Sequence, residues 1–240
     1  MHGSVRRVAV RRVRVDEAGS GPYSVAAGAD GAVWCTLVHA GRVGRLAVGG
    51  GEFTSYALDD PGCRPSVLTP GPDGALWFTR GGDHRIGRVD TGGRSRSYDL
   101  PAPGCGPYGI APGPDGALWF TELSGDRIGR ITTGGVVREF PLPGPGARPH
   151  AITPGPDGRC WFTEWASGRV GAIDPEGRVE RFGPLGETDS EPHGLCFAPV
   201  EGAAGAGGRL GLYVALEAGE IAVVETGHGG EGRGRAGTPV

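Results

Sequence analysis

Three residues toward the C-terminal end of the chain have side chains that could hold a divalent cation and move a proton. Glu191 and His193 lie in the run EPHG, and Glu217 follows the run LYVAL. Magnesium in proteins is commonly held by one or two carboxylates while it keeps several waters. A histidine beside such a site can act as a general base, because its unperturbed pKa lies near neutrality. With His150 upstream, these residues form a candidate site for metal-assisted acid–base chemistry.

The candidate residues stand where a repeated sequence departs from its own pattern. Four copies carry a tryptophan within runs such as GPDGALWFT, and these are Trp34, Trp77, Trp119 and Trp161. A fifth copy begins at EPHGLCF, where Tyr213 takes the place of the tryptophan and a Gly- and Ala-rich insertion replaces the GPDG turn. The spacing indicates five units of about 42 residues each.

Each unit contains four short strand-like runs, which in the third copy are PYGIAP, ALWFT, RIGRI and VVREF. Turn residues such as PDG separate them, and apolar and polar residues alternate in the last two. A unit of this size cannot bury both faces alone, so neighbouring units must stack. Four strands per unit of about 42 residues are typical of a β-propeller. We therefore predict an all-β fold, a propeller of about five four-stranded blades.

The ends of the chain suggest how the ring would close. The fifth copy ends after IAVVETG, before any fourth strand, and residues 8–15 precede the first copy with alternating valine and arginine from Val10 onward. We expect this N-terminal segment to supply the missing outer strand and to present its arginines to solvent, as edge strands often do. Residues 1–226 would then form one domain, and the Gly-rich residues 227–240 a disordered tail.

One position in each copy is placed to line the mouth of the central channel. In an antiparallel meander, the first strand starts where the second strand ends, so the residue after each opening proline lies at that mouth. These residues are Tyr23, Ser66, Tyr108, His150 and His193. They are polar and differ between copies while their surroundings repeat, which favours function over scaffold. Position alone is equally compatible with His150 and His193 capping strand ends through backbone hydrogen bonds.

Glu191 and Glu217 both break the repeat. Glu191 replaces the glycine or arginine that precedes the opening proline elsewhere. Glu217 lies one position beyond the site of Glu122 and Glu164, and side chains alternate between faces along a strand, so its carboxylate should turn to the opposite face. Both glutamates are therefore expected to be functional, whereas Glu122 and Glu164 are expected to make structural bonds between blades.

Composition narrows the classes of function. The net charge of the 240-residue chain is −3, which gives no drive toward phosphate backbones or anionic lipid. No apolar stretch approaches a membrane span, and the basic N-terminus lacks the apolar core of a secretory signal. We expect a soluble, cytoplasmic monomer that binds neither nucleic acid nor membrane. The five cysteines form no CxxC pair and are expected to be free thiols.

Several runs resemble the virginiamycin B lyase family, propellers that inactivate streptogramin B antibiotics. They are GPYSV, GPYGIAPGPDGALWFTELSGDRIGRI, RPHAITPGPDGRCWFTEW and EPHGLCF, and the resemblance extends over residues 22–225. Non-catalytic propellers share the blade sequence itself. The order RPHAI, then EPHG one blade later, then ALE is more specific to the family.

The resemblance implies a lyase that opens the ester bond of a small cyclic depsipeptide antibiotic by elimination, without water. It implies that His193 is the catalytic base, that Glu191 and Glu217 bind Mg²⁺, and that His150 and Tyr23 contact the substrate. Elimination requires no nucleophile, and the chain contains no GxSxG run.

The resemblance also raises a question of blade number, since family members have seven blades and this chain has room for five. The copies with the candidate residues are the first and the last two, which would become neighbours in a closed ring. Two other functions stay open. A non-catalytic propeller could bind a peptide or ligand at its rim, and a calcium-dependent lactonase would require more carboxylate or amide ligands than this rim offers.

Overall fold

The computed structural model describes residues 12–15, 19–49, 51–186, 190–200 and 210–225. These residues form five antiparallel sheets with meander topology, one for each copy of the repeat, as the sequence predicted. Blade 1 contains β1 (Pro22–Ala27), β2 (Val33–Leu37), β3 (Arg42–Leu46) and β4 (Phe53–Ala57). Blade 2 contains β5 (Pro65–Pro70), β6 (Leu76–Arg80), β7 (Arg85–Val89) and β8 (Ser95–Asp99).

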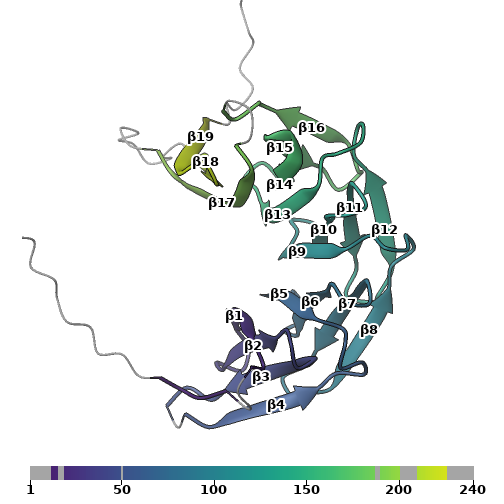
Figure 1. Cartoon of the computed structure of the whole chain (residues 1–240), viewed down its shortest axis with the longest axis vertical. Helices are drawn as coiled ribbons and strands as arrows, with labels where there is room; N and C mark the ends of the chain where they lie inside the picture. The colour runs from purple at the N-terminus through teal and green to yellow at the C-terminus, as the bar shows by residue number, and fades with distance from the viewer. Residues whose placement is uncertain (1–11, 16–18, 50, 187–189, 201–209, 226–240) are drawn as a thin grey trace, which may run out of the picture.

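The other three blades follow the same order along the chain. Blade 3 contains β9 (Pro107–Pro112), β10 (Leu118–Glu122), β11 (Arg127–Ile131) and β12 (Val137–Pro141). Blade 4 contains β13 (Pro149–Pro154), β14 (Cys160–Glu164), a short 3-10 helix η1 (Trp165–Ser167), β15 (Arg169–Ile173) and β16 (Val179–Phe182). Blade 5 contains β17 (Pro192–Pro199), β18 (Leu210–Leu216) and β19 (Glu220–Glu225). The first strand of every blade lies on the concave side of the molecule (Figure 1).

The repeated tryptophans lie in the second strands and are fully or almost fully buried. In blade 2, Trp77 stacks on Tyr98 from the outermost strand, with 5.4 Å between ring centroids. Its Nε1 donates a hydrogen bond of 2.9 Å to Asp73 of the PDG turn, and Arg88 donates to the other carboxylate oxygen. Burial tends to raise the pKa of Asp73, but these two hydrogen bonds lower it overall. The turn aspartates thus anchor the tryptophans as well as shape the turns.

The glycine of the RIGRI runs is required by close packing inside each blade. A Cβ atom at Gly87, Gly129 or Gly171 would collide with the ring of the phenylalanine on the neighbouring second strand. A larger residue there would push that strand out of the sheet, which accounts for this glycine within a strand interior.

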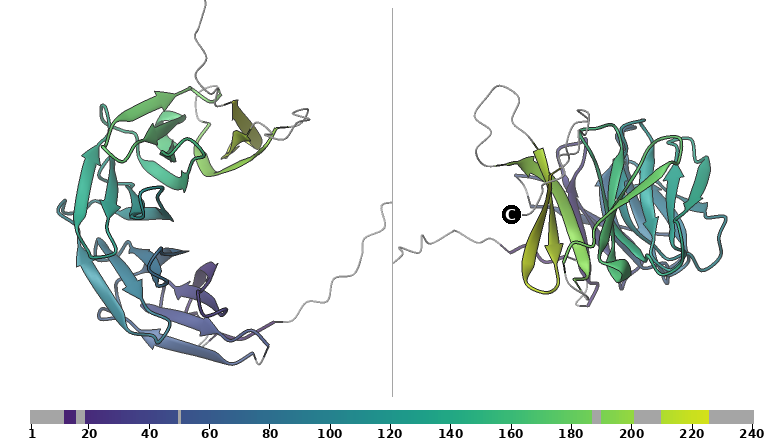
Figure 2. Two further views of the ribbon diagram at one scale, coloured as in Figure 1. Left: turned by 180° about the vertical axis from the view of Figure 1, so that it is seen from behind. Right: turned by 90° about the horizontal axis from the view of Figure 1, so that it is seen from above.

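The five blades form an open arc, so the predicted closure by the N-terminal strand is not confirmed (Figure 1). Blade 5 has three strands among the described residues, and residues 12–15 belong to no sheet. The rest of the predicted closing strand, residues 8–11, and the predicted tail, residues 227–240, lie outside the described part. The first and last blades lie at opposite ends of the arc, as the views in Figure 2 also show. Clusters of buried apolar residues join each pair of neighbouring blades, and five blades packed in this way do not complete a circle.

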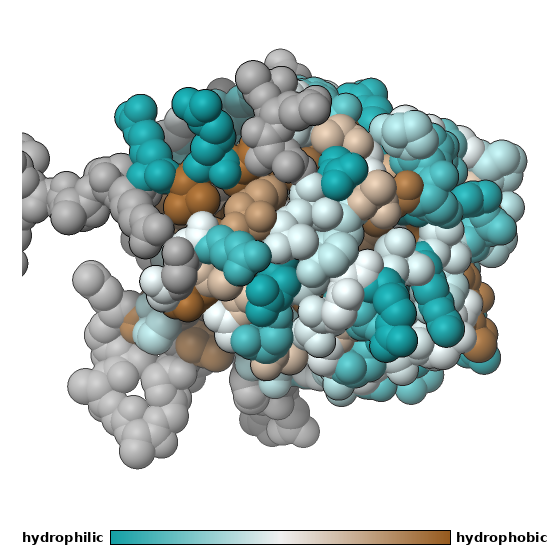
Figure 3. All heavy atoms as spheres, turned by 90° about the horizontal axis from the view of Figure 1, so that it is seen from below, coloured by the Kyte–Doolittle hydropathy of each residue, from teal (hydrophilic) through white to brown (hydrophobic). Residues whose placement is uncertain are grey.

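The open ends expose side chains that inner blades bury. Val25 of β1 is 70% exposed, whereas Leu68, at the same register in β5, is 5% exposed. At the other end Ile221 is 69% exposed, whereas its counterpart Ile128 is fully buried. On the face shown in Figure 3, brown apolar residues gather toward the opening of the arc, while hydrophilic residues cover most of the rest.

Two further sequence expectations can be compared with the structure. All five cysteines are free thiols, and four of them are buried. Among the described residues, no helix has the length and apolar character needed to cross a membrane.

Candidate functional site

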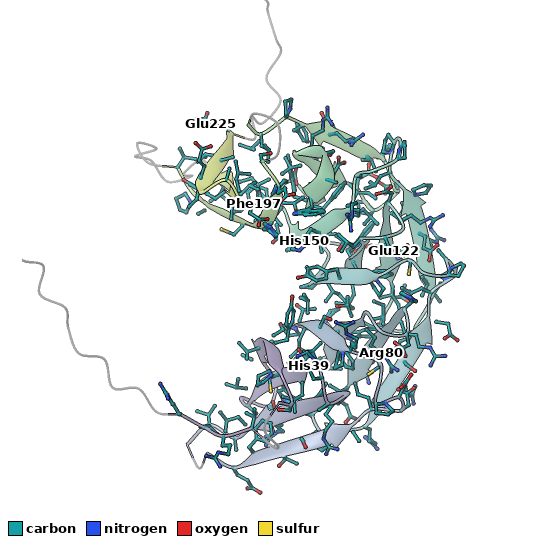
Figure 4. All side chains as sticks on the ribbon, in the orientation of Figure 1. His39, Arg80, Glu122, His150, Phe197 and Glu225 are labelled. Atoms are coloured by element: carbon teal, nitrogen blue, oxygen red, sulfur yellow. The ribbon has the colours of Figure 1, made fainter. Side chains whose placement is uncertain are left out.

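The residues at the start of each innermost strand form a rim along the concave side of the arc. Throughout, "the rim" denotes Tyr23, Ser66, Tyr108, His150 and His193. The strand pairing places the opening proline of each blade opposite the last residue of the second strand, for example Pro149 opposite Glu164. Figure 4 shows His150 on the concave side, with Glu122 deeper within its blade. The rim position that the sequence predicted is therefore present in the structure.

Four members of the rim and Glu217 form a continuous series of contacts. The hydroxyl oxygens of Tyr23 and Tyr108 lie 2.6 Å apart, and the ring centroids of Tyr108 and His150 lie 4.3 Å apart. The rings of His150 and His193 meet edge-on at 4.8 Å. His193 Nε2 in turn lies 2.8 Å from Glu217 Oε2. The series joins blades 1, 3, 4 and 5 along one surface.

Tyr23 reaches this series by a different route from the one predicted. A closed ring would bring blade 1 beside blade 5, and hence Tyr23 beside His193. In the open arc these blades lie at opposite ends, and Tyr23 instead contacts Tyr108 of blade 3. Ser66 does not join the series, because its hydroxyl donates to the main-chain carbonyl of Arg64.

Tyr108 belongs to the contact series, although its place in the repeat predicted only that it lies at the rim. Burial and the hydrogen bond with Tyr23 raise its pKa to about 12. The phenol therefore stays protonated at neutral pH and can donate a hydrogen bond. The signal that could have identified it is the run GPYG, which repeats in the third copy the GPY that draws attention to Tyr23.

Glu217 occupies the orientation that strand alternation predicted. Leu216 stands opposite Pro192 at the register of Glu164 and is 6% exposed, so Glu217 projects from the end of β18. The side chain of Glu217 is 59% exposed and that of His193 is 40% exposed. The hydrogen bond with His193, and next the one with the Glu191 side chain, lower the pKa of Glu217. Glu217 is thus a carboxylate at neutral pH.

Glu191 has a backbone conformation that non-glycine residues rarely adopt. The residue before each opening proline has a positive φ, and in blades 1 and 3 it is glycine, Gly21 at 67° and Gly106 at 62°. Glu191 has a φ of 37°. Because the left-handed region costs a residue with a Cβ atom about 1–2 kcal/mol, glycine would fit this turn better. Arg64 and Arg148, before the opening prolines of blades 2 and 4, have φ values of 49° and 46°, so the positive φ belongs to this turn in every blade and gives no separate sign of function at Glu191.

His150 is held in its neutral form. Burial, and next the nearby His193, lower its pKa to about 4. Its Nδ1 atom is buried and has no hydrogen-bond partner within the described part of the chain. At neutral pH the imidazole can therefore donate from one nitrogen and accept at the other.

The two carboxylates suit a hard divalent cation. The carboxyl groups of Glu191 and Glu217 lie within hydrogen-bonding reach of each other, and Glu217 is exposed enough for waters to complete a coordination shell. Magnesium is often bound by one or two carboxylates and several waters. Across the described residues, no three His, Cys, Asp or Glu side chains gather as ligands of one metal ion. The donor set therefore fits a solvated Mg²⁺ better than a metal enclosed by protein ligands.

The expected bonds between blades at Glu122 and Glu164 are wrong for both residues. Glu164 forms an ion pair with Arg181, which lies on the outermost strand of the same blade. Glu122 faces Glu139, also on the outermost strand of its own blade, and burial and next that charge raise the pKa of Glu122 to about 8. Both side chains therefore point toward the outermost strand of their own blade and not toward the neighbouring blade. The spacing of the repeat alone does not show this direction.

Several known proteins that are similar to this chain are lyases of one family. Residues 8–147 and 125–224 match a sequence model described as the virginiamycin B lyase family. A virginiamycin B lyase of Saccharopolyspora erythraea is 50% identical over 54 residues, which make up 22% of this chain and 18% of that protein. The solved structure of a streptogramin B lyase is 38% identical, with a TM-score of 0.78, and the match covers 87% of this chain and 66% of that one.

Another similar solved structure contains quinupristin. It is a catalytically inactive histidine-to-alanine variant of the virginiamycin B lyase from Staphylococcus aureus with quinupristin. It is 37% identical, with a TM-score of 0.78, and the match covers 87% of this chain and 67% of that one. The chain spans about two thirds of the length of these solved lyases and a smaller share of the curated relative.

Proposed function

Because the chain belongs to the virginiamycin B lyase family, we propose that it opens the ester bond of a streptogramin B-type cyclic depsipeptide by elimination. The observation that carries this proposal is the contact of His193 with Glu217, beside Glu191 and His150, on one rim. A relative that loses its activity when one histidine becomes alanine supports a histidine-dependent reaction.

His193 is the proposed base. Its imidazole takes a proton from the carbon next to a carbonyl group of the substrate. The electrons of that C–H bond form a double bond to the neighbouring carbon, whose bond to the ester oxygen breaks. The ester leaves as a carboxylate on the same, now linear, molecule. Glu217 accepts a hydrogen bond from the imidazole and orients it during this transfer.

Glu191 and Glu217 are the proposed ligands of Mg²⁺. When bound, the ion would supply positive charge near the carbonyl oxygen on which negative charge develops. The lowered pKa of Glu217 keeps it ionised for this purpose.

Tyr23, Tyr108 and His150 are proposed to bind the substrate. The two phenols and the neutral imidazole offer hydrogen-bond donors and apolar ring faces along the rim. Since His150 has a pKa of about 4, it binds without adding a positive charge beside His193.

Mass spectrometry of the antibiotic after incubation with the chain and Mg²⁺ tests the proposal. Elimination should give a linear product with the mass of the starting compound and a new double bond, separable from it by chromatography. Ser66→Ala is a matched control, because Ser66 occupies the same rim position without joining the contact series. A product heavier by one water would contradict elimination.

A second function is favoured by the open arc. This chain has five blades where family members have seven, and its rim lies on the inner side of an open arc (Figure 1). A ligand could bind there even if the side chains of the rim are not placed for catalysis. Binding of the antibiotic with no chemical change in the presence of Mg²⁺ would support this non-catalytic function.

A further inference from the structure

A layer of buried threonines lies beneath the rim. Each of the second strands β2, β6, β10 and β14 carries one fully buried threonine, which we call the threonine layer: Thr36, Thr79, Thr121 and Thr163. Each hydroxyl accepts a hydrogen bond from a main-chain N–H on the innermost strand of its own blade. For Thr163 that donor is the N–H of Ala151, at 3.0 Å.

Each threonine also donates a hydrogen bond to the next blade. The acceptor is the main-chain carbonyl of a rim residue in every case: Ser66 at 2.6 Å, Tyr108 at 2.7 Å, His150 at 2.8 Å and His193 at 2.9 Å. The main chain of each rim residue after the first blade is thus tied to the preceding blade by one buried hydroxyl. Thr121 holds the main chain of His150, and Thr163 holds that of His193.

The layer ends where the succession of blades ends. In β18 the residue at the register of Thr163 is Ala215, which stands opposite Ile221 as Thr163 stands opposite Val170. No blade follows blade 5 among the described residues, and Ala215 is exposed. The hydroxyl is therefore present at each interface between two described blades, which indicates that its purpose is to join them.

We infer that Thr163 is a positioning residue for His193, an inference that rests on the proposed function. Its hydroxyl sets the place of the His193 main chain, and the imidazole then lies between His150 at 4.8 Å and Glu217 at 2.8 Å. Loss of the hydroxyl leaves a buried carbonyl without its partner, and the strand shifts to relieve this. A shift of about 1 Å at a reacting group can lower a rate about 100-fold.

The corresponding threonine of blade 1, Thr36, allows a positioning role to be distinguished from a purely structural one. Thr36 is equally buried and makes the same two bonds, but its acceptor is Ser66, which lies outside the contact series. A structural role predicts similar consequences for loss of either hydroxyl. A positioning role predicts a catalytic defect only when Thr163 is changed.

The experiment compares Thr163→Val with Thr36→Val in the full chain. Both variants should lose similar thermal stability. Thr163→Val should lower kcat by about 10-fold or more with KM changed less than about twofold, while Thr36→Val keeps both constants. Thr163→Ser retains a hydroxyl and should recover most of kcat. If Thr163→Val does not fold, Thr163→Ala and Thr36→Ala, which place no methyl group against the carbonyl, serve for the same comparison.

A readout that does not depend on turnover completes the test. In protein labelled with carbon-13 at histidine, the ring signal of His193 at one fixed pH should move in Thr163→Val and stay in place in Thr36→Val. Equal kcat losses in the two variants, or an unmoved His193 signal in Thr163→Val, would overturn the inference. If the wild-type chain turned over no substrate, the proposed function would fail, and the NMR comparison would still decide the positioning of His193.

Discussion

The rim and the threonine layer lie next to each other and vary in opposite ways along the chain. The layer repeats one residue type with the same two hydrogen bonds in four blades. The rim changes from tyrosine and serine in the first blades to histidine in the last two. The repeated layer fixes where the main chain of the rim lies, so that the side chains are free to differ. The difference indicates that the repeated residues determine the scaffold, and that the residues which vary between blades determine the proposed chemistry.

The largest effect is expected at the rim itself. His193→Ala should lower kcat by about 100- to 10,000-fold, the range that a positioned general base contributes. Because the side chain is 40% exposed, the melting temperature should change little. Steady-state kinetics and thermal unfolding of the same preparation measure both. A His193→Ala variant with wild-type activity would show that His193 is not the general base.

A smaller loss is expected from Glu217→Gln, which keeps the shape of the side chain and removes its charge. The variant should lose about 10- to 100-fold in activity, and more Mg²⁺ should be needed for half-maximal activity, because one proposed ligand is neutral. Titration of activity with Mg²⁺ measures this shift. Glu220→Gln, on β19 of the same blade, serves as the control for a general change in charge. An unchanged Mg²⁺ requirement in Glu217→Gln would exclude it as a ligand.

The residue that follows each threonine of the layer is also buried, and in blade 3 this residue, Glu122, provides a test of stability. Glu122 has a folded pKa of about 8 against a usual value of 4.5, so its contribution to stability is complete below pH 4.5 and is lost as the pH rises to about 8. Glu122→Gln should remove this dependence and raise the free energy of unfolding at pH 7 by about 1–3 kcal/mol. Urea unfolding of both proteins at pH 5 and pH 7 measures the difference, which should be smaller at pH 5.

The matched change in the next blade should have the opposite sign. Glu164 is paired with Arg181 and accepts a hydrogen bond from Ser167, so Glu164→Gln should lower the free energy of unfolding by about 1–3 kcal/mol. Stabilisation by both substitutions would show that the two buried carboxyl groups have the same environment, contrary to the structure.

The smallest effect contrasts stability with activity at the residue that precedes the opening proline of blade 5. Glu191→Gly should relieve the positive φ and raise the free energy of unfolding by about 1 kcal/mol, while activity falls because a carboxylate is lost. Thermal unfolding and kinetics measure the two changes. A loss of stability would mean that the Glu191 side chain supports the turn, and a retained activity would mean that it has no part in the reaction.

Local features of the fold could be predicted from the sequence because they depend on period and alternation. The repeat predicted four-stranded blades, and strand alternation predicted that Glu217 lies near His193. The closure of the ring was not predictable, because it depends on the angle at which apolar clusters pack neighbouring blades. The contact of Tyr23 with Tyr108 depends on the same angle between blades. The approach of Glu122 to Glu139 lies within one blade and depends on which way the two side chains turn, which the spacing of the repeat does not determine.

The most direct test of the central claim is the mass of the product formed in water enriched in heavy oxygen. If His193 removes a carbon-bound proton and the ester leaves by elimination, the linear product carries no heavy oxygen and keeps the mass of the antibiotic. His193→Ala should give no product. Incorporation of one heavy oxygen from the solvent would show hydrolysis and contradict the proposed reaction.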